Sequence, residues 1–302
     1  MYVFELVLST QARSVDDAAE FGGRSGWRMP VVLCHVCSSW RTLALKTLSL
    51  WMSFSLVLDK PGAPLRGLDA SLGLWLQGSE RTEVAVNLEV DPTCAHVLDG
   101  ELMAKLGVIM RRCWKVRLNV SHETFRGILN LQLPRLRTLE VRSSWLAKHI
   151  GGITIQAPKL QTLEILGPTM VNFSQDALPW DQLREYRGTC WADVQRHLDI
   201  MRLSPNLESC TLYSFYESKG PVVPIRLACL RRLHVASYLG ASVGGFLRCL
   251  EVPALEELRL EIPEESPAHG HSVWPKKDVS DLLDRSRVKL ERLELVGMDR
   301  SQ

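Results

Sequence analysis

Apolar positions recur along the second half of the chain with a nearly constant spacing. A core of the form L-x-x-L-x-L opens at Leu136 and returns at Leu160, Leu183, Leu207, Leu230, Leu255 and Leu290. The steps between successive copies are 24, 23, 24, 23, 25 and 35 residues, and a weaker copy at Cys113 stands 23 residues before the first. A fixed period of this length is typical of a repeat protein.

Within each copy the last apolar residues alternate with polar ones, which is the period of a β-strand. We therefore expect Leu139 and Val141 to point inward and Glu140 to point outward. The same alternation places four further residues inward, namely Leu163, Ile165, Leu258 and Leu260. One such strand cannot bury its apolar face alone, whereas parallel stacking of successive copies gives a continuous core.

The residues between two copies must return the chain to the start of the next strand. After Cys190, the residues Val194, Leu198 and Met201 share one helical face, and Ser204-Pro205 are expected to end that helix. The longest step contains "IPEESPAHGHSVWPKKD", from Ile262 to Asp278, whose Pro, Gly and charged residues predict a surface loop.

The pattern from about Val108 to Val296 resembles leucine-rich repeats, whose period is about 20 to 29 residues. The resemblance implies an α/β fold, an irregular solenoid with a parallel β-sheet on its concave side and helices or loops on its convex side. Residues 108–302 would form this domain, after a linker and first irregular repeat at 59–107. The family usually closes each turn with Asn or Cys, but the corresponding positions here are Ser144, Pro168, Trp191, Phe215, Tyr238, Pro263 and Met298.

The outward positions of such strands would form a concave surface for a target protein. The candidate target-binding residues are Glu140, Arg142, Glu164, Arg187, Tyr213, Arg232, His234 and Arg259. Their charges are of both signs, so they do not form a dedicated phosphate-binding arginine cluster. An ordinary solvated face is the alternative interpretation.

A second apolar pattern lies near the start of the chain, in "VVLCHVCSSWRTLAL". Its residues Leu33, Val36, Cys37, Trp40, Leu43 and Ala44 recur at helical intervals, which predicts one amphipathic helix. A second short segment ends at Leu50 and Trp51. A helical pair of this size cannot hide two tryptophans and so many leucines, so a partner or the adjoining repeats must cover part of it.

These eight residues resemble the second half of the F-box, which reads approximately L-x-x-V-C-basic-x-W-basic-x-[LI]-A and then P-x-L-W. The chain departs from it at Ser38 and Leu48, and the opening L-P-x-E is absent, although Val3 to Leu8 looks like its continuation. The helical F-box-like module would occupy residues 1–58. Followed by irregular leucine-rich repeats, it is similar to F-box proteins of mushroom-forming fungi.

The resemblance implies a non-catalytic substrate-recognition subunit of an SCF-type, cullin-based ubiquitin ligase. A Skp-type adaptor would bind Leu33, Val36, Cys37, Trp40, Leu43, Ala44, Leu50 and Trp51, and the repeats would bind an unknown target protein. Because L-P-x-E is absent, a second interpretation stays open, in which the chain is a repeat scaffold with a degenerate F-box that does not bind the adaptor. Trp40 and Trp51 would then be core residues of a helical cap.

Charge and composition exclude several classes of partner. The chain has 36 Lys and Arg against 34 Asp and Glu, so its net charge of +2 gives no bulk attraction to nucleic acid or to anionic membranes. Its best membrane candidate, Leu43 to Leu58, contains Lys46 and is shorter than the about 20 apolar residues of a spanning helix. We expect a cytoplasmic or nuclear protein whose eight cysteines are thiols.

Sequence signatures of catalysis and of metal binding are absent. Cys34 and Cys37 form a C-x-x-C, but a zinc site needs a second pair and a c-type haem needs His where Ser38 stands. The phosphate-binding, dinucleotide-binding, nucleophile-elbow and H-E-x-x-H motifs do not occur. We therefore expect no catalytic residues, metal or cofactor, and a small-molecule enzyme is the least favoured class.

Overall fold

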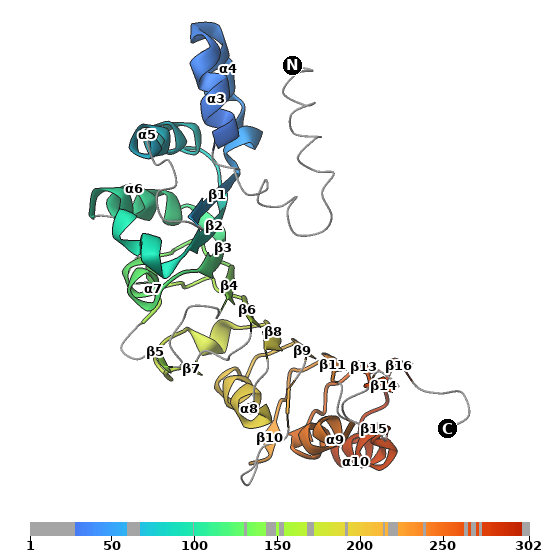
Figure 1. Cartoon of the computed structure of the whole chain (residues 1–302). Helices are drawn as coiled ribbons and strands as arrows, with labels where there is room; N and C mark the ends of the chain where they lie inside the picture. Colours follow the sequence, from blue (N-terminus) through green and yellow to red (C-terminus); the bar gives the residue numbers. More distant parts are fainter. Residues whose placement is uncertain are drawn as a thin grey trace. The chain divides into compact units, whose positions relative to one another are not determined.

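The structure, a computed structural model, describes residues 28–58, 67–98, 100–129, 132–142, 149–150, 154–167, 172–190, 193–213, 215–216, 223–237, 240–262, 265–266, 270–271 and 274–297 (Figure 1). The chain divides into two units. Unit 1 comprises 1–160 with 176–178, and unit 2 comprises 161–175 with 179–302. The predicted F-box start, Val3 to Leu8, and most of the turn positions that replace the family's Asn lie outside the described residues.

Unit 1 begins with helices and continues as a parallel sheet. The helical segment consists of α3 (Arg28–Val36), α4 (Ser38–Lys46) and η1 (Leu48–Trp51). The strands β1 (Ser53–Leu58), β2 (Val84–Val90), β3 (Cys113–Asn119) and β4 (Thr138–Arg142) then pair in chain order, all parallel. The connections contain α5 (Leu68–Gly78), η2 (Pro92–Val97), α6 (Gly100–Met110) and α7 (His122–Leu129), and β5 (His149–Ile150) follows. Helices α5, α6 and α7 lie on one side of the strands (Figure 1).

The register of unit 1 lines up its apolar residues across the strands. One row contains Phe54, Val86, Val116 and Leu139, and the next contains Leu56, Leu88, Leu118 and Val141, all fully buried. The parallel sheet therefore begins at Ser53, earlier than expected. β1 lies within the expected helical module at 1–58, and β2 lies within the stretch expected to contain a linker and the first irregular repeat, 59–107.

Unit 2 repeats the same arrangement with a more regular sequence. The strands β6 (Thr162–Gly167), β8 (Glu185–Cys190), β9 (Ser209–Tyr213), β11 (Arg232–Ala236), β13 (Glu257–Glu261) and β16 (Arg292–Val296) are parallel and neighbours in that order. The helices are α8 (Val194–Leu203), α9 (Gly240–Arg248) and α10 (Lys276–Ser286), and they lie on one side of this sheet (Figure 1). Short elements are β7 (Asn172–Phe173), η3 (Trp180–Gln182), β10 (Ile225–Arg226), β12 (Leu250–Glu251), β14 (Glu265–Ser266) and β15 (Gly270–His271).

The predicted inward residues form the core of both units. Leu139, Val141, Leu163, Ile165, Leu258 and Leu260 are all buried, which confirms the strand alternation. Except for Leu290, which is partly exposed, the leucine that opens each copy is buried in the turn before its strand. There its N–H donates to the carbonyl three residues earlier, as in Leu160 to Ala157 and Leu207 to Ser204. The L-x-x-L-x-L pattern thus encodes one buried turn followed by one strand.

Helix α8 occurs where it was predicted, and its residue His197 fills a space in the core beside Gly188. Val194, Leu198 and Met201 are buried, and the helix ends at Leu203. The next core position after Tyr186 is Gly188, where an added Cβ would lie 2.6 Å from Cε1 of His197. The glycine is therefore needed because His197 occupies the space that a side chain would otherwise fill.

The predicted loop from Ile262 to Asp278 is partly wrong. Glu265–Ser266 pair antiparallel with Gly270–His271, and α10 begins at Lys276. Pro275 stands directly before α10, and Asp278 lies in the first turn of that helix. Proline suits a helix start because it lacks an N–H, and the first N–H groups of a helix have no partner within the helix. An acidic residue in the first turn is favoured by the helix dipole. Among the replaced family Asn positions, Phe215 is described. It is fully buried, with its ring 5.6 Å from that of Phe246, so an aromatic contact closes this turn.

Candidate functional site

The helical segment of unit 1 is interrupted within the predicted amphipathic helix. Cys37 has extended backbone angles, φ −162° and ψ 173°, and separates α3 from α4. The serines at 38 and 39 are poor helix-interior residues and begin α4 after this break. The Arg41 side chain donates to the Cys34 carbonyl at 3.1 Å, which satisfies a backbone acceptor at the end of α3. The prediction of one continuous helix is therefore wrong, because its apolar spacing continues across the break.

Half of the predicted adaptor-binding residues lie in the interior instead of on a surface. Leu33, Ala44, Leu50 and Trp51 are buried, the last completely. The Trp51 indole N–H donates to the Ala44 carbonyl at 2.9 Å, and its ring packs edge-on against Trp75 at 5.1 Å. Direct contact of these four side chains with a partner is corrected to a structural role, because unit 1 itself already covers them.

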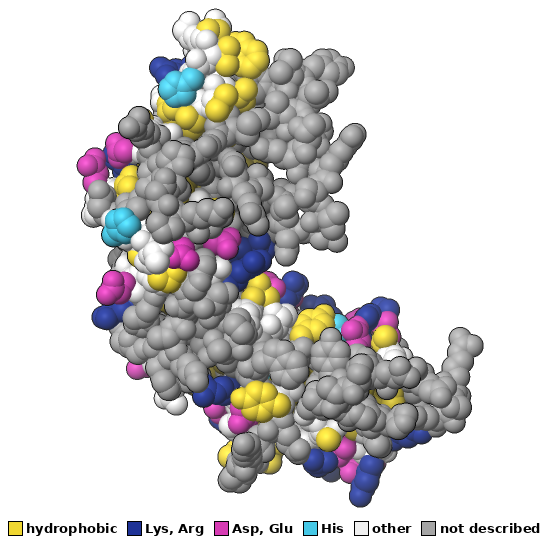
Figure 2. All heavy atoms as spheres, in the orientation of Figure 1, with side chains coloured by type: hydrophobic (Ala, Val, Ile, Leu, Met, Phe, Trp, Pro, Cys, Tyr) yellow, Lys and Arg dark blue, Asp and Glu magenta, His cyan; other side chains and the backbone are white. Residues whose placement is uncertain are grey.

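The other half of the motif lies closer to the surface. Val36, Cys37 and Leu43 are exposed, and Trp40 is half-buried. Three further apolar residues that the motif did not single out are also exposed, namely Val32, Leu48 and Met52. We call Val32, Val36, Leu43, Leu48 and Met52 the apolar surface set; their exposed fractions run from 43% to 57%. Hydrophobic side chains gather over α3 and α4 in Figure 2.

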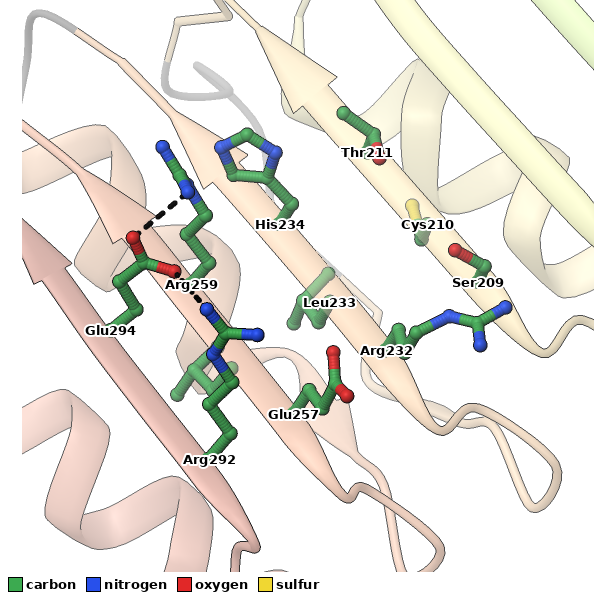
Figure 3. Close-up of a pocket in the computed structure, with 11 residues that line it drawn as sticks. Ser209, Cys210, Thr211, Arg232, Leu233, His234, Glu257, Arg259, Arg292 and Glu294 are labelled. Carbon is green, nitrogen blue, oxygen red and sulfur yellow. Dashed lines mark hydrogen bonds and ion pairs between the residues drawn. The ribbon is translucent and has the colours of Figure 1, made fainter.

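Polar side chains cover the open face of the sheet of unit 2, which is the face away from its helices. The register aligns them in rows across the strands. One row contains Glu185, Ser209, Arg232, Glu257 and Arg292, and the next contains Glu164, Arg187, Thr211, His234, Arg259 and Glu294. Between β9 and β16 they surround a hollow of about 250 Å³ (Figure 3).

Most charges along one side of this hollow are paired. Arg259 donates to Glu294 at 2.9 Å and to Glu261 at 2.6 Å, and Arg292 lies 3.5 Å from Glu294. Burial raises the pKa of Glu261, but the hydrogen bond from Arg259 and nearby positive charge outweigh it and hold that pKa below its ordinary value. Glu261 is therefore ionised, and both Glu261 and Glu294 are paired with arginine.

His234 connects this charge network to an aromatic residue. Its Nε2 lies 3.1 Å from Glu261 Oε1, and its Nδ1 lies 3.4 Å from the Tyr213 hydroxyl. Burial lowers the pKa of His234 more than Glu261 raises it, so the imidazole is neutral at neutral pH. Tyr213, His234 and Arg259, three of the predicted target-binding residues, thus lie together.

Two charged residues of the hollow, Glu257 on β13 and Arg232 on β11, form no ion pair with any residue in the described part of the chain. The Arg232 side chain extends from β11 toward β9 (Figure 3). Ser209 and Thr211 place small hydroxyl groups on the neighbouring strand. The hollow therefore offers one unpaired guanidinium, one unpaired carboxylate, two hydroxyls and a set of neutralised ion pairs to a bound protein.

The remaining predicted target-binding residues are not part of this hollow. Glu164 and Arg187 lie on the same sheet, and Arg187 pairs with Glu185 at 2.8 Å. Glu140 and Arg142 belong to unit 1. Glu140 is only 1% exposed, and its Oε1 lies 2.5 Å from Arg117 Nε, so its assignment as an outward recognition residue is corrected. A buried partner on the adjacent strand explains its position.

The described residues offer neither a metal site nor a membrane-spanning helix. No group of three or more His, Cys, Asp or Glu side chains that could hold a metal ion occurs there. Cys34 of the C-x-x-C is buried and Cys37 is exposed, so the two thiols do not share one environment. Within the same part of the chain, no helix is long and apolar enough to cross a membrane.

The buried pair of Tyr186 and His197 is a feature that sequence reasoning missed. The Tyr186 hydroxyl lies 2.8 Å from His197 Nδ1, and desolvation lowers the pKa of His197 to about 4. The histidine is therefore neutral and belongs to the core. The available signal was the glycine at a core position of the repeat, Gly188.

Comparison with known proteins supports the repeat assignment. A family model described as At1g61320/AtMIF1, LRR domain, matches residues 117–301, which is more than half of the chain. This confirms the leucine-rich repeats expected from about Val108 to Val296, a fold used widely for protein–protein interaction. No curated protein sequence matches the chain. The F-box resemblance lies outside the matched residues and stays a prediction. The chain belongs to the At1g61320/AtMIF1 leucine-rich-repeat domain family.

Proposed function

We propose that the chain is a non-catalytic recognition protein with two binding surfaces. The open face of unit 2 binds a target protein, and the helical segment binds a Skp-type adaptor of a cullin-based ubiquitin ligase. The adaptor-binding assignment depends on one observation: the apolar surface set is exposed, although the core of the helical segment is already filled.

The F-box-like residues divide into two roles in this proposal. The buried residues stabilise the helices through packing; they are Leu33, Ala44, Leu50 and Trp51. The exposed Val36 and Leu43 contact the adaptor. Covering exposed apolar surface is favourable by about 25 cal/mol per Å². Several exposed apolar residues gathered on neighbouring helices are typical of a protein-interaction site.

The open face of unit 2 suits a protein target because its charges are ordered in advance. Arg259, Glu261 and Glu294 are held by one another, so little side-chain freedom is lost when a target binds. The ligase chemistry would take place on another protein. This chain would contribute effective concentration and orientation, for which it needs no nucleophile of its own.

Co-precipitation with a purified Skp-type adaptor tests the proposal. The wild-type chain should bind the adaptor, and a Val36→Asp/Leu43→Asp double variant should lose about 2 kcal/mol or more of binding free energy. Both side chains are exposed, so the variant should fold normally, as checked by circular dichroism. Val223→Asp is the matched control, because Val223 is equally exposed and lies in unit 2.

The two contrary results have different meanings. If the wild-type chain does not bind the adaptor, the alternative of a repeat scaffold with a degenerate F-box is favoured. If the double variant binds as well as the wild type, adaptor binding stands but the apolar surface set is not its site.

A further inference from the structure

Two apolar residues of β16 are exposed at positions whose aligned residues in the neighbouring strand β13 are buried. Leu293 aligns with Leu258, and Leu295 aligns with Leu260. Leu258 and Leu260 are 1% and 0% exposed, whereas Leu293 and Leu295 are 48% and 37% exposed. The two leucines of β16 therefore have a neighbour on one side and solvent on the other.

One edge of β16 also lacks a backbone partner among the described strands. β16 pairs with β13, and no strand in the described part of the chain pairs with its other edge. Unpaired N–H and C=O groups on an apolar edge are a template for another strand. The first strand of unit 1 differs, because Phe54 and Leu56 of β1 are fully buried and Phe54 packs against Trp75.

We propose that a second copy of this chain binds the β16 edge, so that two β16 strands pair antiparallel about a two-fold axis. Side chains must stay on their own face of the sheet, which excludes a shift of the register by one residue. Among the registers left, one places Leu293 opposite the partner's Leu293 and Arg292 opposite the partner's Glu294. Symmetry makes that charge contact twice.

The charges of β16 favour this register over its neighbours. A register two residues further along the chain would place Glu294 opposite the partner's Glu294, which is repulsive. Arg292 is free to reach across, because its side chain is 67% exposed and its own contact with Glu294 is long, at 3.5 Å. Glu294 is held in place by Arg259 at 2.9 Å. The edge is therefore self-complementary in both apolar and charged residues.

Analytical ultracentrifugation over a range of protein concentrations tests the proposal. The wild-type chain should sediment as a dimer at high concentration, and Leu293→Lys should abolish the dimer. Arg292→Glu alone should weaken the dimer about tenfold or more, because the introduced carboxylate would then face the partner's Glu294. Glu294→Arg alone should weaken it similarly, through two facing arginines.

Mixing the two charge variants is the decisive step. In a mixed dimer each glutamate faces an arginine again, so Arg292→Glu and Glu294→Arg chains should associate with one another more tightly than with themselves. Arg226→Glu is the matched control, since Arg226 is exposed on β10 and pairs with Glu251 at 3.0 Å, and it should leave the dimer intact. A wild-type monomer at every concentration, a dimer that survives Leu293→Lys, or a mixture that does not associate would each overturn the proposal.

Discussion

At the scale of single residues, His197 couples the stability of the protein to pH. In the folded chain, burial lowers its pKa from about 6.5 to about 4, so between these values the unfolded chain binds a proton that the folded chain does not. The free energy of unfolding should therefore fall as the pH drops from 6.5 to 4, by about 3 kcal/mol from this residue. Urea unfolding at a series of pH values measures the fall.

His197→Gln separates this effect from the titration of carboxylates. Glutamine does not titrate and retains a polar group for the Tyr186 hydroxyl, so the variant should lose less stability over the same pH range. His96→Gln is the control, because His96 is exposed and should not alter the slope. Parallel curves for wild type and His197→Gln would contradict this account. The sequence carried one signal for the space that His197 fills, the glycine at core position 188, but it did not identify His197, because Tyr186 and His197 come from different elements.

At the scale of elements, the fit of α5 against η1 depends on one glycine. An added Cβ at Gly78 would lie 2.2 Å from Cδ2 of Trp51, whereas one at Gly73 in the same helix would meet nothing within 4 Å. Gly78→Ala should lower the free energy of unfolding by about 1–3 kcal/mol through overpacking. Gly73→Ala should be neutral or stabilising by up to about 1 kcal/mol, because alanine favours a helix. Thermal or urea unfolding compares the two, and equal effects would be inconsistent with the packing described.

The strands were predictable as elements, whereas the helical segment was not. Alternation with period 2 is a local signal, and in Leu163 and Ile165 or Leu258 and Leu260 it coincides with burial. The break at Cys37 leaves no trace in the apolar spacing, so one helix was expected where two occur. The strand β1 was not predicted, and β2 was expected only as part of an irregular repeat, because "SFSLVL" and "VAVNLEV" lack the preceding L-x-x-L turn that marks the later copies.

At the scale of the whole molecule, equivalent repeat positions should differ in their contribution to stability. Leu258→Ala removes a buried side chain between two strands and should lower the free energy of unfolding by about 2–5 kcal/mol. Leu293→Ala, at the aligned position of β16, removes a half-exposed side chain and should cost less than about 1 kcal/mol in the monomer. Urea unfolding at low protein concentration makes the comparison, and similar losses would mean that Leu293 is covered in solution.

The candidate sites were predictable in position but not in detail. Sequence periodicity correctly placed Arg232, His234 and Arg259 on one sheet face, because the strand register follows from the repeat. It could not foresee that Glu140 pairs with a buried Arg117, since that contact depends on which strands are neighbours. Nor could the F-box-like motif separate the buried Trp51 from the exposed Val36, because a motif records residue types and not their exposure.

The bare edge of β16 also affects how the protein comes apart. In a repeat array each strand is stabilised by its immediate neighbours, so β16, which has one paired neighbour among the described residues, is the easiest to detach. Unit 2 would fray from β16 and peel inward toward β13, exposing a fresh edge at each step. A second chain bound along that edge would prevent this detachment. Dilution, which dissociates the dimer, would then also lower the stability of unit 2.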